Sequence, residues 1–127
     1  MLIEDYFQEV RDIIEACSVV QLSNVNYDSR SIYRGFMRGE LKFLDGSVLY
    51  LREFVDVKTT IVREMYSYHY ENASKKLIFR YDNTRHHKKL NLPNYPHHKH
   101  DSSEDNVISS NAPMLAEVLN EIARLLG

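Results

Sequence analysis

The sequence contains no tryptophan and only one cysteine among its 127 residues. The single cysteine, Cys17, excludes an internal disulfide framework and is typical of a reducing compartment. No run of about 18 apolar residues occurs, so the sequence predicts no membrane-spanning helix. The first segment, MLIEDYFQEV, is acidic where a signal peptide is basic, and we therefore expect a cytoplasmic protein without a membrane partner.

Several catalytic signatures are absent as well. The chain has no P-loop, no dinucleotide-binding glycine pattern and no GxSxG elbow, which leaves nucleotide hydrolysis and serine hydrolase chemistry without support. It also lacks a cysteine pair and the HExxH spacing of zinc helices. His97, His98 and His100, together with His86 or His87, could supply zinc ligands, but adjacent histidines in a loop rarely all point at one ion. We therefore expect no metal site and no cofactor.

The charges of the chain are sorted along the sequence. The whole chain carries a net charge of −2, yet the window 75–100 holds seven lysines and arginines against one acid, Asp82. This window therefore carries +6 and the remainder −8. The stretch Arg80–His100 also holds five of the six histidines. Such a basic segment on an acidic protein indicates a site for phosphate or RNA, or a docking surface for an acidic partner.

Hydrophobic periodicity predicts a single α+β domain over residues 1–127. Its expected order is an N-terminal helix, an antiparallel meander of about five strands, a long basic histidine-rich loop and a C-terminal helix. Apolar spacing places the first helix over 2–16. Pro113 suits the first turn of the last helix, with Asn111 or Ser110 as its N-cap. Val107 and Ile108 are expected to form a short strand or a hydrophobic anchor. The strands are expected over 18–27, 31–43, 48–54, 60–70 and 76–83.

Two hairpins have specific expected registers. A two-residue turn at Asp45-Gly46 would place Arg38 opposite Glu53, either as a cross-strand ion pair or with Glu53 acting as a general base. The apolar face of this hairpin would consist of Leu41, Phe43, Val48, Tyr50 and Phe54.

A four-residue loop over 71–74 would close the second hairpin. It would place Tyr70 opposite Lys75, in an aromatic face shared with Tyr66 and Tyr68. The opposite, polar face would then place Arg63 across from Asp82.

Several stretches together resemble one protein family. They are the hairpin arm DGSVLYLREF, the strand YSYHYE, RYDN with the following HH, and PHHKH before a final helix. This combination resembles the TumE family, the toxin component of bacterial and archaeal toxin–antitoxin pairs. The resemblance implies a small cytosolic growth inhibitor that is neutralised by a separate antitoxin with a helix-turn-helix domain.

The residue types in the basic window fit a metal-independent ribonuclease. Histidine suits the base that takes the 2′-OH proton and the acid that protonates the leaving oxygen, since its pKa lies near neutrality. Arginine holds phosphate with a permanently charged fork. The catalytic candidates are Arg80, Asp82, His86, His97, His98 and His100, with His87 beside them. The candidates for RNA binding are Arg63, His69, Asn83, Arg85, Lys88, Lys89 and Lys99.

Each of these residues could instead have a purely structural or solvent-exposed role. Histidines in a loop are frequently solvated surface, and an Asp-Asn pair at a strand end is an ordinary turn former. The alternative function is therefore a non-enzymatic toxin or binding module whose basic segment docks a cellular target or an acidic antitoxin. Strand edges of a small meander also pair readily, so a homodimer is a further expectation.

Overall fold

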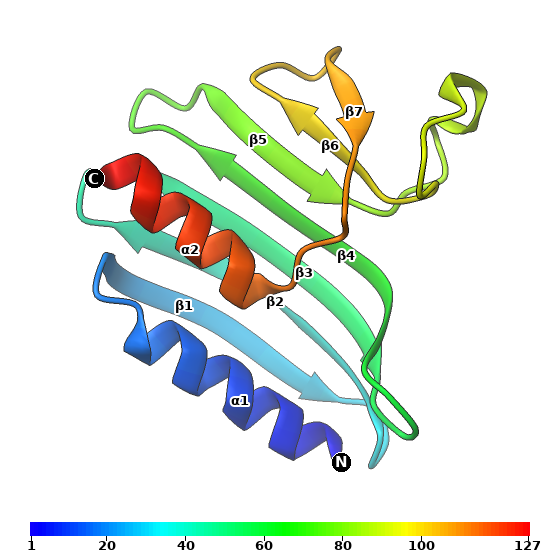
Figure 1. Cartoon of the computed structure of the whole chain (residues 1–127). Coiled ribbons are helices and arrows are strands. Elements are labelled where there is room, and N and C mark those ends of the chain that lie inside the picture. Colours follow the sequence, from blue (N-terminus) through cyan, green and yellow to red (C-terminus); the bar gives the residue numbers. More distant parts are fainter.

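A seven-stranded antiparallel sheet, in which neighbouring strands follow one another in the sequence, carries both long helices on one face (Figure 1). The structure, a computed structural model, describes residues 1–127. The elements are α1 (Ile3–Ala16), β1 (Val20–Ser29), β2 (Arg34–Phe43), β3 (Val48–Asp56), β4 (Val62–Glu71), β5 (Leu77–Asp82), η1 (Lys88–Leu90), β6 (His98–Asp101), β7 (Val107–Ser109) and α2 (Leu115–Leu126). Neither helix has the length and apolar character that crossing a membrane requires.

The predicted α+β class is confirmed, but the sheet has seven strands where about five were expected. One of the two additional strands, β6, lies in the segment predicted to be a loop. β6 consists of the polar residues HKHD and shows no alternation of apolar with polar residues. Only the burial of its residues alternates, since His98 and His100 are buried and Lys99 is not. Of the two alternatives for Val107 and Ile108, a short strand or a hydrophobic anchor, the structure has the strand, β7.

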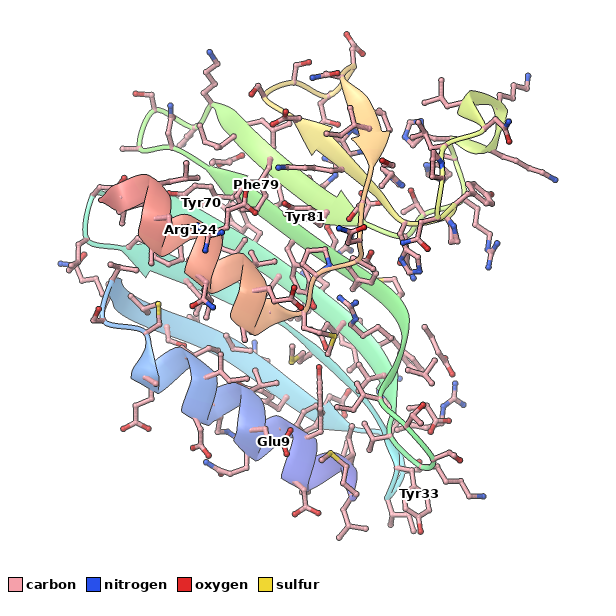
Figure 2. All side chains as sticks on the ribbon, in the orientation of Figure 1. Glu9, Tyr33, Tyr70, Phe79, Tyr81 and Arg124 are labelled. Atoms are coloured by element: carbon pink, nitrogen blue, oxygen red, sulfur yellow. The ribbon has the colours of Figure 1, made fainter.

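The hydrophobic core lies between the helices and one face of the sheet. α1 contributes Ile3, Phe7 and Val10, all nearly inaccessible to solvent. An aromatic row continues the core along β4 and β5, where the ring centroids of Tyr70 and Phe79 lie 5.2 Å apart (Figure 2). Burial of such side chains is the main source of stability in a domain of this size.

The register of the β2–β3 hairpin differs by one residue from the prediction. Leu41 pairs with Leu49, and Lys42 with Val48. Gly46 has a φ of +85° and extends the turn to three residues, the pattern of a hairpin closed by a glycine bulge. A one-residue shift exchanges the two faces of a strand. The predicted core members Val48, Tyr50 and Phe54 therefore face away, and the buried residues of β3 are Leu49, Leu51, Glu53 and Val55.

The predicted ion pair between Arg38 and Glu53 is wrong for the same reason. Arg38 lies opposite Arg52, while Glu53 pairs with Met37 and is completely buried. The Glu53 carboxylate accepts hydrogen bonds from the hydroxyl groups of Tyr6 and, at 2.5 Å, Tyr68. Glu53 therefore ties α1 to the sheet inside the core.

The β4–β5 hairpin has a longer loop than predicted, yet its faces are as expected. Tyr70 pairs with Phe79, where Lys75 was expected, and a bulge follows it. This shift of four residues is even, so it keeps the aromatic residues on one face. The predicted pairing of Arg63 with Asp82 is wrong, because Asp82 lies opposite Ser67.

The last helix begins later than predicted. Pro113 lies before the helix, and Met114 occupies the cap position. The Met114 N–H donates to the carboxylate of Glu117 at 3.2 Å, which satisfies one free backbone donor of the helix start. Ser110 instead accepts the N–H of Ala112 within the preceding turn.

Candidate functional site

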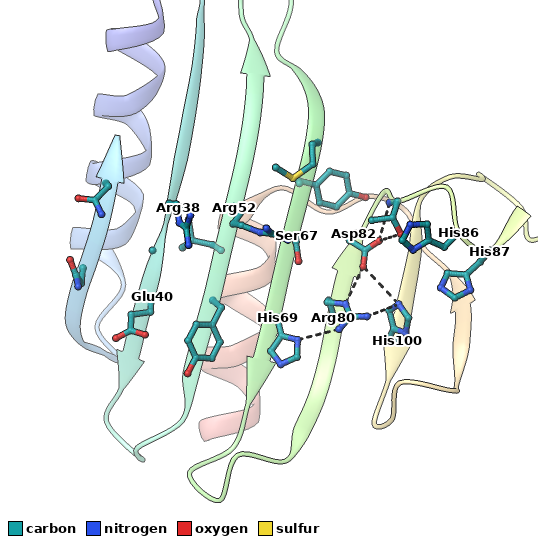
Figure 3. Close-up of a pocket in the computed structure, with 18 residues that line it drawn as sticks. Arg38, Glu40, Arg52, Ser67, His69, Arg80, Asp82, His86, His87 and His100 are labelled. Carbon is teal, nitrogen blue, oxygen red and sulfur yellow. Dashed lines mark hydrogen bonds and ion pairs between the residues drawn. The ribbon is translucent and has the colours of Figure 1, made fainter. Parts of the chain in front are cut away.

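The face of the sheet opposite the helices is uncovered and hollowed. A depression of about 820 Å³ extends across it, lined by side chains from β1 to β6 and from the segment that follows β5 (Figure 3). We call this depression the sheet groove. Only four of its eighteen lining residues are hydrophobic, so the groove suits a polar or charged ligand.

Two arginines face each other on the floor of the sheet groove. Arg38 on β2 and Arg52 on β3 are directly opposite partners, and both are exposed. Neither forms an ion pair. Like charges at opposite positions destabilise a sheet. An anion bound between these guanidinium groups would relieve that repulsion.

Asp82 lies at the end of β5 and is 3% exposed. Its Oδ1 accepts hydrogen bonds from the backbone N–H and the hydroxyl of Thr84, both at 3.0 Å. Its Oδ2 accepts the Nε–H of Arg80 at 3.1 Å. Burial by itself would raise the pKa of this carboxyl, but the donors of Thr84 and the nearby His98 and Arg80 outweigh burial and lower it. Asp82 therefore carries a buried negative charge.

Arg80 is the hub of an ion-pair network beside Asp82. Its two terminal nitrogens donate to the Glu104 carboxylate at 2.6 and 2.7 Å, a bidentate arrangement. One of them also lies 3.2 Å from Nε2 of His100, and the other 3.5 Å from Nδ1 of His69. These partners engage the whole guanidinium group. Arg80 is thus held in place as a positioning group and has little capacity left for a phosphate.

His98 and His100 stand side by side on β6, and both are buried. Nδ1 of His98 lies 2.9 Å from the carbonyl oxygen of Pro96, and Nδ1 of His100 lies 2.9 Å from that of Glu104. Because a carbonyl oxygen only accepts hydrogen bonds, both Nδ1 atoms carry protons. The Nε2 atoms then point toward Asp82, at 2.9 Å from His98 and 3.8 Å from His100.

His87 covers these two histidines from the side of the sheet groove. Its ring centroid lies 4.8 Å from that of His98 and 5.3 Å from that of His100, edge to face in both cases. Burial, followed by the neighbouring histidines, lowers the pKa of His87 below its usual value. His86 lines the same groove and is exposed. The structure therefore brings Arg80, Asp82, His98 and His100 together, with His86 and His87 at the surface.

His97 lies on the other face of the sheet from this cluster. Its Nδ1 is 2.8 Å from the Tyr66 hydroxyl, and the two rings stack at 5.7 Å. Burial, followed by the charge of Arg63, lowers the pKa of His97. Arg63 also belongs to this face, where its guanidinium donates at 2.7 Å to the carbonyls of Ala112 and Pro113.

The remaining RNA-binding candidates are dispersed. Lys99 lies on the helix side, over the rings of Phe79 and Tyr81. Asn83 bridges β4 and β5, since its side chain accepts the Tyr66 N–H at 3.1 Å. His69 lines the sheet groove beside Arg80. The segment 83–97 between β5 and β6, which we call the basic loop, holds the remaining candidates Arg85, Lys88 and Lys89, and all three are exposed.

Sequence reasoning missed Arg38 and Arg52 as groove residues. Both precede the basic window, and the wrong hairpin register assigned Arg38 to an ion pair. The signal that identifies them is their opposite placement once the glycine bulge is included. Thr84, which donates twice to Asp82, was also missed because hydroxyl donors leave no pattern in a sequence.

Comparison with known protein families gives one match. The family model described as Toxin TumE matches residues 10–126. The chain belongs to the TumE toxin family. TumE membership makes it a toxin of a toxin–antitoxin system, and the matched range includes all seven strands. No curated protein and no solved structure matches the chain.

Proposed function

We propose that this toxin belongs to a type II pair and cleaves RNA in the sheet groove by metal-independent acid–base chemistry. Its partner is a separate antitoxin with a helix-turn-helix domain, and its place of action is the cytoplasm. The observation that carries the proposal is the position of His87. This partly exposed imidazole rests on two buried histidines and a buried aspartate, in a groove that also holds two unpaired arginines.

The arginines of the groove floor supply the binding of the RNA backbone. Arg38 and Arg52 lie directly opposite each other and repel, so a phosphate between them gains two charge-assisted contacts and offsets that repulsion. Tyr50 lies next to them on β3 and is 42% exposed, which provides a ring for base stacking. The groove thereby offers phosphate and base contacts without any deep pocket for a single nucleotide.

The proposed reaction is an internal transfer within the RNA. His87 takes the proton of a 2′-hydroxyl, and that oxygen attacks the adjacent phosphorus while the bond to the 5′-oxygen breaks. His86, the neighbouring exposed imidazole, donates the proton that the leaving 5′-oxygen requires. The products are a 2′,3′-cyclic phosphate and a 5′-hydroxyl. Asp82, His98 and His100 act as positioning residues, since their burial keeps them from the substrate.

The experiment compares RNA cleavage by purified, antitoxin-free variants in the presence of EDTA. We expect His87→Ala to slow cleavage about 100-fold or more, the usual effect of removing an acid–base group. His97→Ala, on the opposite face, decides which face is active and is expected to cleave normally. Arg38→Ala combined with Arg52→Ala weakens RNA binding, whereas Lys58→Ala, an exposed cation in the β3–β4 turn, does not.

A docking function is the second candidate, and the exposed cations of the basic loop favour it. Arg85, Lys88 and Lys89 are exposed and do not line the sheet groove. For a nuclease, His87→Ala abolishes growth arrest while antitoxin binding survives. For a docking toxin, Lys88→Ala with Lys89→Ala removes both together. Intact RNA from a folded protein that still arrests growth would overturn the nuclease proposal.

A further inference from the structure

Three histidines lie close together at the wall of the sheet groove, where His87 and His100 line it. His87, His98 and His100 each bring one ring nitrogen to within 4.8 Å of the other two. We propose that these three imidazoles bind a divalent transition-metal ion of the zinc class, with the Asp82 carboxylate beside it. The sequence predicted no such site, because adjacent histidines seldom share an ion. Here His98 and His100 share one face of β6, and His87 arrives from a different segment.

The two buried rings are already oriented as metal ligands. Their Nδ1 atoms donate to the backbone carbonyls of Pro96 and Glu104, each at 2.9 Å. A hydrogen bond from the second ring nitrogen to a carbonyl is the usual support of a metal-binding histidine. It fixes the ring and leaves the lone pair on Nε2. Nε2 of His98 lies 2.9 Å from an Asp82 oxygen, and Nε2 of His100 lies 3.2 Å from a terminal nitrogen of Arg80.

His98 supplies a second, independent observation. The residue is 2% exposed, and its Nε2 has no hydrogen-bond partner. The atom lies 2.9 Å from Oδ1 of Asp82, within ion-pair distance but outside hydrogen-bond geometry. With the proton on Nδ1, two electron-rich atoms face each other at this distance. Only a positive charge between them, either a proton or a metal ion, turns that repulsion into attraction.

The charges around the cluster favour a cation. Asp82 and Glu104 contribute two negative charges, and Arg80 contributes one positive charge, which leaves −1 when the histidines are neutral. A metal on His100 would displace the 3.2 Å contact from Arg80. Arg80 would still retain its bonds to Asp82 and its bidentate pair with Glu104.

The ligand chemistry selects the type of metal. Imidazole nitrogens suit Zn²⁺, Co²⁺, Ni²⁺ and Cu²⁺, whereas Mg²⁺ and Ca²⁺ prefer oxygen ligands. Zinc–nitrogen bonds of about 2.0 Å in a tetrahedral site put ligand atoms roughly 3.3 Å apart. The cluster must therefore contract, and His87 is the member that can move, because it is only partly buried.

The test measures metal uptake by the folded chain without RNA. Zn²⁺ is titrated calorimetrically into metal-free protein, and the absorption spectrum of the Co²⁺ form reports the ligands. We expect one ion per chain and a rise in melting temperature. His87→Ala, a substitution at the surface, is expected to weaken binding at least about 10-fold. His98→Gln removes it, and circular dichroism verifies that this buried variant folds.

His97→Gln is the matched control, because His97 lies on the opposite face and is expected to leave zinc affinity unchanged. Affinity weaker than about 0.1 mM, or equal affinity in wild type and His87→Ala, would overturn the site. A nitrogen NMR spectrum showing both ring nitrogens of His98 protonated, with no zinc uptake, would assign the positive charge to a proton.

One consequence rests on the proposed function. A metal bound through one ring nitrogen of His87 leaves the other nitrogen carrying the proton of the neutral imidazole, so His87 could no longer accept the 2′-hydroxyl proton. Zinc-loaded protein is therefore expected to cleave RNA more slowly than protein in EDTA. Faster cleavage with zinc would overturn this inhibition. The binding titration uses no RNA, so its failure and the failure of the nuclease proposal are distinguishable.

Discussion

Replacing Glu53 by alanine is expected to destabilise the fold strongly. Glu53 is fully buried and accepts hydrogen bonds from Tyr6 on α1 and Tyr68 on β4. Its removal orphans two buried hydroxyl groups, each costing about 1–3 kcal/mol. The alanine variant no longer has to bury a carboxylate, and the desolvation cost that this removes offsets part of the loss. The net decrease in the free energy of unfolding is about 3 kcal/mol, near the upper end of ordinary single substitutions.

Urea denaturation followed by circular dichroism measures this change. For a chain of this length it corresponds to a fall in melting temperature of roughly 10 °C. Glu15→Ala is the matched control, because Glu15 is exposed on the same helix that Glu53 contacts. We expect the control to stay within about 0.5 kcal/mol of wild type. A similarly small effect for Glu53→Ala would refute the buried-network reasoning.

The pH dependence of Glu53→Gln gives a second measurement on the same group. Burial raises the pKa of Glu53, although the hydrogen bonds from Tyr6 and Tyr68 oppose that shift. The folded chain then keeps a proton that the unfolded chain has released. The stability from this group is full below the ordinary glutamate pKa and is lost as the pH rises through the raised one. Wild type should therefore lose stability relative to Glu53→Gln across that window.

Three further substitutions test other contacts by the same denaturation assay. Asp82→Asn removes a buried charge that faces Arg80, and we expect a loss of about 3 kcal/mol. Arg63→Met loses two hydrogen bonds to backbone carbonyls before α2, at a cost of about 2 kcal/mol. Gly39→Ala would place a methyl group 2.2 Å from the carbonyl oxygen of Asn24, so it is expected to destabilise by at least about 2 kcal/mol. If any of these variants is as stable as wild type, the corresponding contact does not contribute to stability as proposed.

Local sequence patterns predicted the elements well and the hairpin registers poorly. The first helix and the strands up to Asp82 have strong apolar periodicity, which burial against the opposite layer enforces. Register depends on turn length, and a single glycine bulge at Gly46 changed it by one residue. That odd shift exchanged the faces of β3 and buried Glu53. The even shift in the β4–β5 hairpin left the aromatic face intact.

The candidate site was predictable in part. Asp82, as the lone acid in a basic window, and the histidines of PHHKH were visible in the sequence, and His98 and His100 do meet Asp82. His97 immediately precedes β6 and contacts Tyr66 on the opposite face, and the polar residues of β6 did not indicate a strand there. Long-range pairing brought Arg38 and Arg52 to the groove, and no local pattern encodes it.

Analysis of the RNA fragment ends tests the central claim most directly. Purified wild-type chain is incubated with cellular RNA in EDTA, alongside His87→Ala, and the 3′ ends of the products are identified chemically. The proposed reaction predicts fragments ending in a 2′,3′-cyclic phosphate, strongly reduced with His87→Ala. Fragments with 3′-hydroxyl ends, equal cleavage by the variant, or uncut RNA from folded protein would contradict it.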